Sequence, residues 1–186
     1  FVTILAQQKS TKEPFTPEQI HRIQNSENMA ADVAMIMIAT GCRPNELFSA
    51  TVENCFDTYF ISGSKTEAGK NRVIPVSPVG LEAYRKLLEA ARAKNSKNLI
   101  DGYPGNKSPK NFANRDWKAL MDSLEIQNMT PYNCRHTYTT LAVKSGVKPE
   151  LLQKILGHAD YSTTVEVYTH LDTQELLTAA QSVTIL

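Results

Sequence analysis

The residues of this chain best suited to chemistry include two arginines at the ends of predicted helices. Arg43 lies in the segment TGCRPNEL (40–47), and Glu46, one helical turn further on, could orient its guanidinium. Arg135 lies in TPYNCRHT (130–137), on the first turns of another mostly apolar segment. A guanidinium is permanently charged and can direct two hydrogen bonds onto phosphate oxygens, a geometry that lysine does not match. Taken singly, each arginine is also explained by an ordinary ion pair with a carboxylate.

Two short segments near the C-terminus add histidine and tyrosine side chains. They are LGH (156–158) and YTH (168–170). Taken singly, such a histidine satisfies a hydrogen bond of the core, and such a tyrosine packs. A tyrosine hydroxyl has a pKa of about 10, so Tyr168 would need help to lose its proton if it acted as a nucleophile.

The sequence predicts no metal site and no cofactor site. The four histidines fall at no ligand spacing such as H-E-x-x-H, and the three cysteines form no C-x-x-C pair. The stretch 63–70 resembles a phosphate-binding loop, but five residues separate its glycines where four are required, and Asn71 stands where Ser or Thr would bind magnesium. The odd number of cysteines favours a reducing, cytoplasmic compartment.

Helices are predicted to carry most of these residues. The segment TPEQ (16–19) has a capping hydroxyl, proline at the first helical position and glutamine at the capping-box position, so a helix begins there. Residues 29–39 are apolar on nearly every side, which predicts a helix buried all round and ended by Gly41. Pro44 begins a short helix. Further helices are predicted over 81–91, 109–124, 131–145, 149–156, 161–168 and 173–181.

One hairpin interrupts the helices. The β-favouring runs 58–64 and 71–76 are separated by the basic tip KTEAGK (65–70). The predicted fold class is therefore mainly α with a small antiparallel β-sheet, that is, α+β.

The length and composition fit one globular domain. The chain has 186 residues, of which 41% are hydrophobic and 21% are charged. No run approaches the roughly 20 apolar residues of a membrane-spanning helix. The stretch 7–13 is polar and lacks hydrophobic periodicity, so residues 1–15 are predicted to be a linker cut from a longer protein. Residues 16–186 form the predicted domain, including a terminal helix over 173–183.

The net charge of +1 conceals a segregated basic block. Residues 61–120 contain twelve Lys and Arg against five Asp and Glu, so this block carries +7, while the flanking blocks carry −3 each. Such a block is either a solvated face or a surface that faces phosphates, and charge alone does not decide between the two.

Taken in order, these motifs closely resemble the catalytic domain of the tyrosine recombinases, the phage-integrase family of site-specific DNA recombinases. The family's motifs are an arginine in a T-G-x-R-x-x-E-L turn, a lysine in a β-hairpin, an H-x-x-R-H box, an L-G-H turn and a Y-T-H segment. Their order and spacing match this chain from Thr16 to His170. The resemblance implies the tyrosine recombinase catalytic-domain fold and a DNA-binding region ahead of residue 16.

The resemblance also implies a role for each matching residue. Arg43 and Arg135 become the phosphate-binding pair, Lys65 the hairpin lysine, His158 the third-box histidine and Tyr168 the nucleophile. Lys65 would be a general acid for the departing deoxyribose oxygen.

One box departs from the family's pattern. Tyr132 stands where the first histidine of H-x-x-R-H is expected, so the residue usually assigned as general base is absent. The phenol of Tyr132 is a poor base at neutral pH and is predicted to position groups. Glu46 and His136 are predicted to support the site. The basic block supplies the predicted contacts to the DNA backbone, which are Lys70, Arg72, Lys107, Lys110 and Arg115.

The function implied is a recombinase or integrase that cleaves and rejoins DNA through a 3′-phosphotyrosine, without metal or ATP, and moves a phage or other mobile element. Two alternatives stay open, namely DNA relaxation like that of a type IB topoisomerase and a DNA-binding module with inactive chemistry. The implied partners are double-stranded recombination sites, three further copies of the chain on DNA (a homotetramer, from a monomer when free) and accessory DNA-bending or directionality proteins. The implied location is the bacterial cytoplasm, at the nucleoid during the reaction, with no membrane contact.

Overall fold

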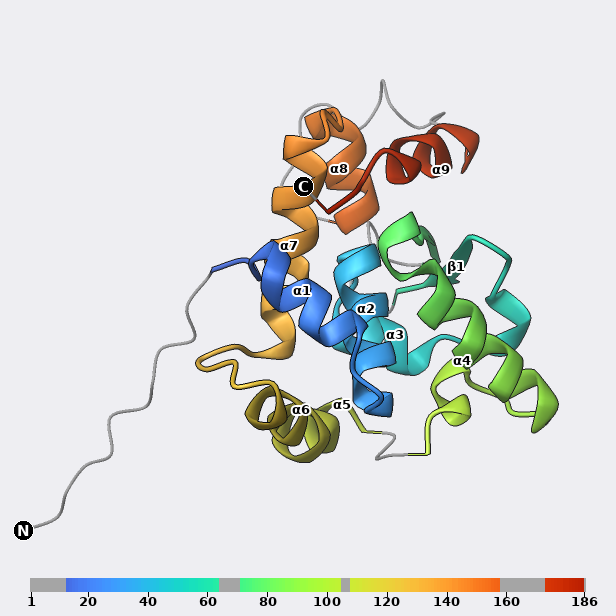
Figure 1. Cartoon of the computed structure of the whole chain (residues 1–186). Helices are drawn as coiled ribbons and strands as arrows, with labels where there is room; N and C mark the ends of the chain where they lie inside the picture. Colours follow the sequence, from blue (N-terminus) through green and yellow to red (C-terminus); the bar gives the residue numbers. More distant parts are fainter. Residues whose placement is uncertain (1–12, 64–70, 105–107, 158–172, 186) are drawn as a thin grey trace, which may run out of the picture.

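The architecture is almost entirely helical and carries one two-stranded sheet (Figure 1). It is a computed structural model that describes residues 13–63, 71–104, 108–157 and 173–185. The longer elements are α1 (Pro17–Gln24), α2 (Met29–Thr40), α3 (Pro44–Ser49), β1 (Tyr59–Ser62), β2 (Arg72–Pro75), α4 (Leu81–Ala93), α6 (Trp117–Ser123), α7 (Pro131–Lys144), α8 (Pro149–Leu156) and α9 (Thr173–Gln181). The short turns are η1 (Val52–Asn54), η3 (Pro78–Gly80), η4 (Leu99–Gly102), α5 (Pro109–Asn111) and η5 (Phe112–Asp116). This confirms the predicted fold class.

Helix α2 is the centre of the core. Ten of its twelve residues are buried, and it contacts α1, α4, α6 and α7. The side chain of Asn28 caps its first turn, and Gly41 ends it in the left-handed conformation (φ +61°). A helix that is apolar on all sides requires partners on all sides, and Figure 1 shows α2 with α7 on one flank and α4 on the other. The prediction of a helix buried on nearly every side is confirmed, with Met29 and Asp32 as its two residues that are not buried.

The predicted hairpin is present as the antiparallel pair β1–β2. Tyr59 pairs with Pro75 at one end and Ser62 pairs with Arg72 at the other. Ser62 and Arg72 are both buried, so the described part of the hairpin closes against the body of the protein. The basic tip that carries Lys65 and Lys70 lies outside the described residues.

The helix predicted over 109–124 differs from the structure. It is divided into α5, the π-helical turn η5 and α6. Within η5 the amide of Trp117 donates to the carbonyl of Phe112, five residues earlier. The wider turn lets both aromatic rings enter the core, where their centroids lie 6.3 Å apart, an arrangement that regular α-helical spacing does not give.

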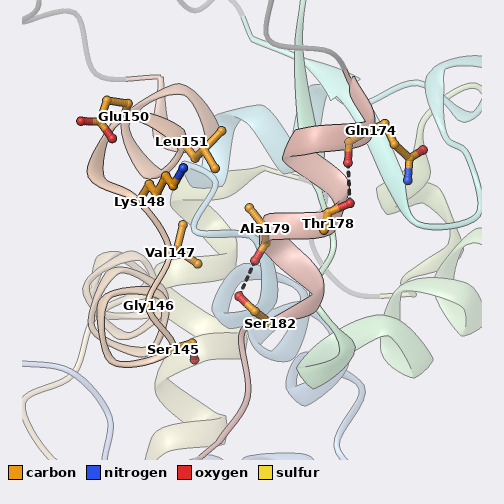
Figure 2. A pocket seen from close by; sticks show the side chains of 10 residues that line it. All are labelled: Ser145, Gly146, Val147, Lys148, Glu150, Leu151, Gln174, Thr178, Ala179 and Ser182. Carbon is orange, nitrogen blue, oxygen red and sulfur yellow. Dashed lines mark hydrogen bonds between the residues drawn. The ribbon is translucent and has the colours of Figure 1, made fainter.

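Helix α9 packs on its own chain, against β2 and α8. Leu176, Ala180 and Val183 are buried by this contact. Between α9 and the α7–α8 connection lies a groove of about 780 Å³, lined in part by Val147, Leu151 and Ala179 (Figure 2). The helix predicted over 161–168 and residues 1–12 of the predicted linker 1–15 lie outside the described residues. None of the described helices has the length and apolar character to cross a membrane.

Candidate active site

Arg43 projects from the sharp turn between α2 and α3. Pro44 is the first residue of α3, and Glu46 reaches back to the start of the helix, where its Oε2 accepts from the backbone N–H of Arg43 at 2.7 Å. The other carboxylate oxygen accepts from Nη1 of Arg43 at 3.2 Å. Glu46 therefore fixes both the backbone and the guanidinium of Arg43, whose side chain is 37% exposed.

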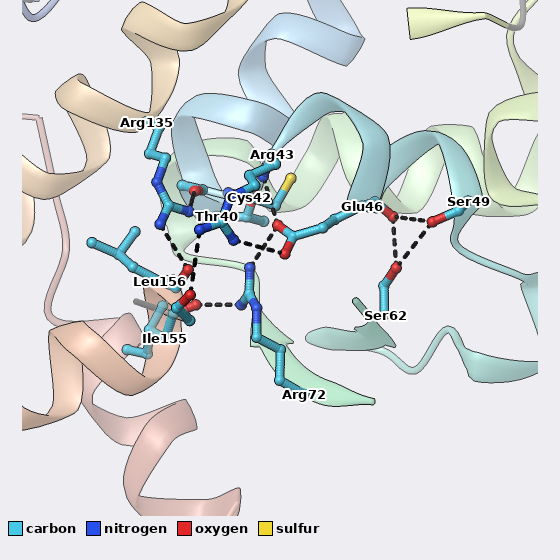
Figure 3. Close-up of polar contacts among 12 residues, drawn as sticks. Thr40, Cys42, Arg43, Glu46, Ser49, Ser62, Arg72, Arg135, Ile155 and Leu156 are labelled. Carbon is cyan, nitrogen blue, oxygen red and sulfur yellow. Dashed lines mark hydrogen bonds and ion pairs between the residues drawn. The ribbon is translucent and has the colours of Figure 1, made fainter. Parts of the chain in front are cut away.

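Arg135 comes from the second turn of α7 and points into the same place. Asn133 caps that helix by accepting from the backbone N–H of Thr130 at 2.7 Å. Arg135 is 5% exposed, and its guanidinium donates to the carbonyls of Gly41 and Leu156, each at 2.7 Å (Figure 3). The fold thus brings together two arginines that lie 92 positions apart in the sequence.

Close packing beneath Arg135 depends on glycine. A Cβ atom on Gly41 would lie 2.6 Å from the ring of Tyr138 and 2.8 Å from the side chain of Leu156. Together with its left-handed φ, this leaves no room for another residue at the end of α2. The sequence TGCR therefore contains glycine for steric as well as conformational reasons.

Arg72 is the third member of the site, and its placement differs from the expectation. The sequence predicted a contact with the DNA backbone, but the side chain is 7% exposed. Its Nη2 donates to Oε2 of Glu46 at 2.7 Å, and its Nη1 donates to the carbonyl of Ile155. Burial removes it from a solvated surface. The alternation of strand β2, in which Ile74 faces the core, is the signal that places Arg72 on the same inward face.

The three arginines meet at the C-terminal end of α8. Arg72, Arg135 and Arg43 donate to three successive carbonyls, those of Ile155, Leu156 and Gly157. The last carbonyls of a helix lack partners within it and carry partial negative charge. We call Arg43, Arg72 and Arg135 the arginine cluster, and it caps α8.

The arginine cluster carries more positive than negative charge. Two of its three guanidinium groups, those of Arg43 and Arg72, pair with the carboxylate of Glu46, whereas that of Arg135 donates to two backbone carbonyls. Burial, reinforced by the charges of Arg43 and Arg72, lowers the pKa of Arg135 to about 10, so Arg135 is still a full cation at neutral pH. Buried cations of this kind are stabilised by pairing with an anion. The described ranges hold no grouping of three or more His, Cys, Asp or Glu side chains suited to a metal ion.

Tyr132 and His136 lie beside the arginine cluster on α7. Tyr132 is 50% exposed, and its ring centroid lies 6.3 Å from that of the half-buried His136. The phenol is therefore open to solvent.

Cys42 and Cys134, which precede the two arginines, are buried, and burial raises the pKa of both thiols, that of Cys42 to about 11. Both are neutral packing residues at physiological pH.

The remaining predicted site residues fall into two groups. Lys65, Lys70, Lys107, His158 and Tyr168 lie outside the described residues. Lys110 and Arg115 are exposed on α5 and η5. The described residues that come nearest to Lys65 and His158 in the sequence are Gly63 and Gly157. Just before Gly63, Ser62 donates to the carbonyl of Glu46. Two residues before Gly157, the carbonyl of Ile155 accepts from Arg72.

Comparison with known proteins shows that the chain belongs to the phage integrase family. The model of the phage integrase family matches residues 14–175. The chain is 28% identical over 179 residues to tyrosine recombinase XerA of Pyrococcus horikoshii, which covers 93% of this chain and 62% of that protein. It is 30% identical over 175 residues to the transposase from transposon Tn916 of Enterococcus faecalis, covering 75% and 42%.

Solved structures share the fold. The integrase from mycobacterium phage Brujita superposes with a TM-score of 0.70 at 17% identity, covering 97% of this chain and 61% of that one. This likeness shows a shared fold. The chain spans about half the length of the relatives that it matches.

Proposed function

Because the chain belongs to the phage integrase family, we propose that it is the catalytic domain of a site-specific recombinase that cleaves and rejoins DNA of a mobile element through a 3′-phosphotyrosine. The observation that carries this proposal is the arginine cluster, in which three guanidinium groups lie together and only two of them pair with a carboxylate, that of Glu46. A phosphodiester is the anion that suits it, because its charge grows as the phosphorus is attacked.

Arg43 and Arg135 bind the scissile phosphate in this proposal. A guanidinium has five N–H groups, so Arg135 can donate to two carbonyls and still direct others at an anion. Arg43 offers the more exposed surface and is held from behind by Glu46. These fixed cations stabilise the pentavalent transition state without reorganising, and they do so without a metal ion.

Tyr168 supplies the nucleophile. Its phenolic oxygen bonds to phosphorus, the bond to the 5′-oxygen breaks, and Lys65 gives that oxygen a proton. His158 donates to a nonbridging oxygen, and the proton of Tyr168 leaves through water beside the exposed phenol of Tyr132. The bond energy stays in the phosphotyrosine, so a free 5′-hydroxyl can reverse the step and join a new strand without ATP.

The whole reaction needs two double-stranded sites. We propose that four copies of the protein, monomeric when free, assemble on them and exchange strands in pairs at the bacterial nucleoid, with accessory DNA-bending or directionality proteins. The region ahead of residue 16 contributes further DNA contacts in this scheme. Residues 16–186 form the catalytic domain, and α9 is its terminal helix.

The test is covalent trapping on a nicked half-site in which the leaving strand diffuses away. The protein is incubated with this DNA in EDTA, digested, and the DNA-linked peptide is identified by mass spectrometry. We expect a link to Tyr168 and none in Tyr168→Phe. A link to Tyr161, the nearest other tyrosine in the sequence, or a strict need for magnesium in forming the adduct, contradicts the proposal.

Two other outcomes identify the alternatives. Relaxation of a supercoiled plasmid that lacks any recombination site indicates a topoisomerase-like enzyme. Binding of DNA without an adduct indicates an inactive binding module, for which Tyr132 is the sequence feature in favour.

A further inference from the structure

We infer that Arg72 is a positioning residue that, together with Ser62, holds the hairpin lysine in register with Arg43, an inference that rests on the proposed function. Arg72 is buried and makes its contacts within the protein, so it acts through other residues and does not touch the DNA. The inference concerns how Lys65 reaches the phosphate that Arg43 binds.

Both residues of the last described hairpin pair bind Glu46. Ser62 and Arg72 face each other across β1 and β2. The hydroxyl of Ser62 donates to the backbone carbonyl of Glu46 at 2.7 Å, and Nη2 of Arg72 donates to its carboxylate at 2.7 Å (Figure 3). Lys65 follows Ser62 by three positions. The hairpin is thus fastened to one residue at the point from which its lysine departs.

The same carboxylate orients Arg43. Oε2 of Glu46 accepts from both Arg72 and the backbone N–H of Arg43, while Oε1 accepts from the Arg43 guanidinium. A shift of the hairpin therefore shifts the group that orients the phosphate-binding arginine. Glu46 thus contacts both Arg43 and the base of the hairpin.

Arg72 also contacts the C-terminal end of α8. Its Nη1 donates to the carbonyl of Ile155, and its stem lies under Gly157, where a Cβ atom would approach Nε to 2.7 Å and Cδ to 2.9 Å. Gly157, left-handed at φ +64°, directly precedes His158. One side chain therefore contacts the hairpin's anchor and the end of the helix that leads to the third-box histidine.

Stability alone is a poor explanation for this arrangement. A buried ion pair gains little over well-packed apolar residues, because desolvation offsets the attraction between its charges. Nε of Arg72 also has no hydrogen-bond partner within the described residues. A guanidinium with defined directions gives what an apolar side chain cannot, which is a fixed geometry between three segments.

The experiment compares two substrates in single-turnover cleavage by the full chain. One is ordinary DNA, and in the other sulfur replaces the bridging 5′-oxygen at the scissile phosphate. A thiol has a pKa of about 8.5, so a thiolate departs without the proton that an alkoxide needs. Loss of the general acid is therefore rescued by sulfur, whereas loss of phosphate binding or of folded protein is not.

Four variants define the pattern. Lys65→Met loses about 100-fold or more on the oxygen substrate, as expected for a general acid, and recovers on sulfur. We expect Arg72→Met to lose about 30-fold on oxygen and less than about 5-fold on sulfur, and Ser62→Ala to follow the same direction with about 5-fold on oxygen. Arg85→Met, on the exposed face of α4, is the matched control and behaves as wild type.

The outcomes separate the inference from its premise. Equal losses of Arg72→Met on both substrates overturn the inference alone. A Lys65→Met variant that sulfur does not rescue overturns the inference together with the general-acid role of Lys65 in the proposed function. Absence of an adduct with the wild-type chain overturns the proposed function as well. If Arg72→Met does not fold, as measured by its melting temperature, Ser62→Ala and Arg72→Lys decide by the same substrate ratio, and a ratio equal to that of wild type in both overturns the inference.

Discussion

Two basic regions of this molecule use the same residue types in opposite ways. In the arginine cluster, each guanidinium has defined partners, either the carboxylate of Glu46 or the last carbonyls of α8. On the basic α5–α6 surface, which we define as Lys110, Arg115 and Lys118, the side chains extend into solvent. The cluster contributes position, whereas the surface contributes charge.

This difference has a physical cause. A charge inside the fold is scarcely screened and is held in one geometry, so its effect depends on direction. A solvated charge is screened by salt and contributes to phosphate binding almost independently of the DNA sequence. Substitutions in the cluster should therefore change the rate of chemistry, and substitutions on the surface should change the affinity for DNA.

The largest expected effect comes from Arg135→Lys. Lysine keeps the charge but cannot donate to the carbonyls of Gly41 and Leu156 at once while also binding an anion. We expect single-turnover cleavage to fall by about 10³-fold, the upper range for losing one transition-state donor. The DNA dissociation constant should change much less. A loss below tenfold would mean that charge alone is enough in the cluster and would erase the contrast with the surface.

Glu46→Gln should have the next largest effect. The substitution removes the carboxylate that Arg43 and Arg72 share and places an amide in a buried site. Breaking a buried pair costs about 3 kcal/mol of stability, so the melting temperature should fall. Cleavage should slow by about 10 to 100-fold at saturating DNA, because Arg43 loses its orientation. An unchanged rate in protein that is still folded would show that Arg43 needs no partner.

The contrast between regions also explains how far the sequence could be interpreted. The helices and the hairpin were predicted because caps, proline positions and apolar periodicity are local signals, as in the capping box of α1. The π-helical turn before α6 was not, because it depends on two aromatic rings finding the same core. The sequence also left open where α9 packs, which depends on its contacts with β2 and α8.

Arg72 is the clearest case of a residue that the sequence placed wrongly. The basic composition of residues 61–120 indicated a surface, and Arg72 was grouped with it. Its partners Glu46 and Ile155 lie 26 and 83 residues away, so nothing local announces them. Two features indicate its burial: Arg72 lies on the inward-facing side of β2, and Gly157, which follows α8, leaves room for its side chain.

Tyr132, on α7 beside the arginine cluster, should have a smaller effect. Its ring is half exposed, and its hydroxyl is a poor base at neutral pH. We expect Tyr132→Phe to lose less than about tenfold in single-turnover cleavage, well below the ~100-fold of a lost general base, and Tyr132→His to keep or raise the rate. Should Tyr132→Phe be as inactive as Arg135→Ala, Tyr132 belongs with the arginine cluster as a direct participant.

The smallest effect on the rate, and the clearest effect on binding, should come from the basic α5–α6 surface. Neutralising Lys110 and Arg115 together removes two solvated charges without disturbing a buried contact. Affinity for cognate and random DNA should fall alike, and the slope of log affinity against log salt should flatten by about one unit for each lost contact. The matched control is Arg85→Gln with Lys86→Gln on α4, where Lys86 pairs with Asp32 at 2.7 Å, and there the slope should stay the same. Equal flattening in both double variants would assign the salt dependence to overall charge, and no flattening in the first would make the α5–α6 surface an ordinary solvated face.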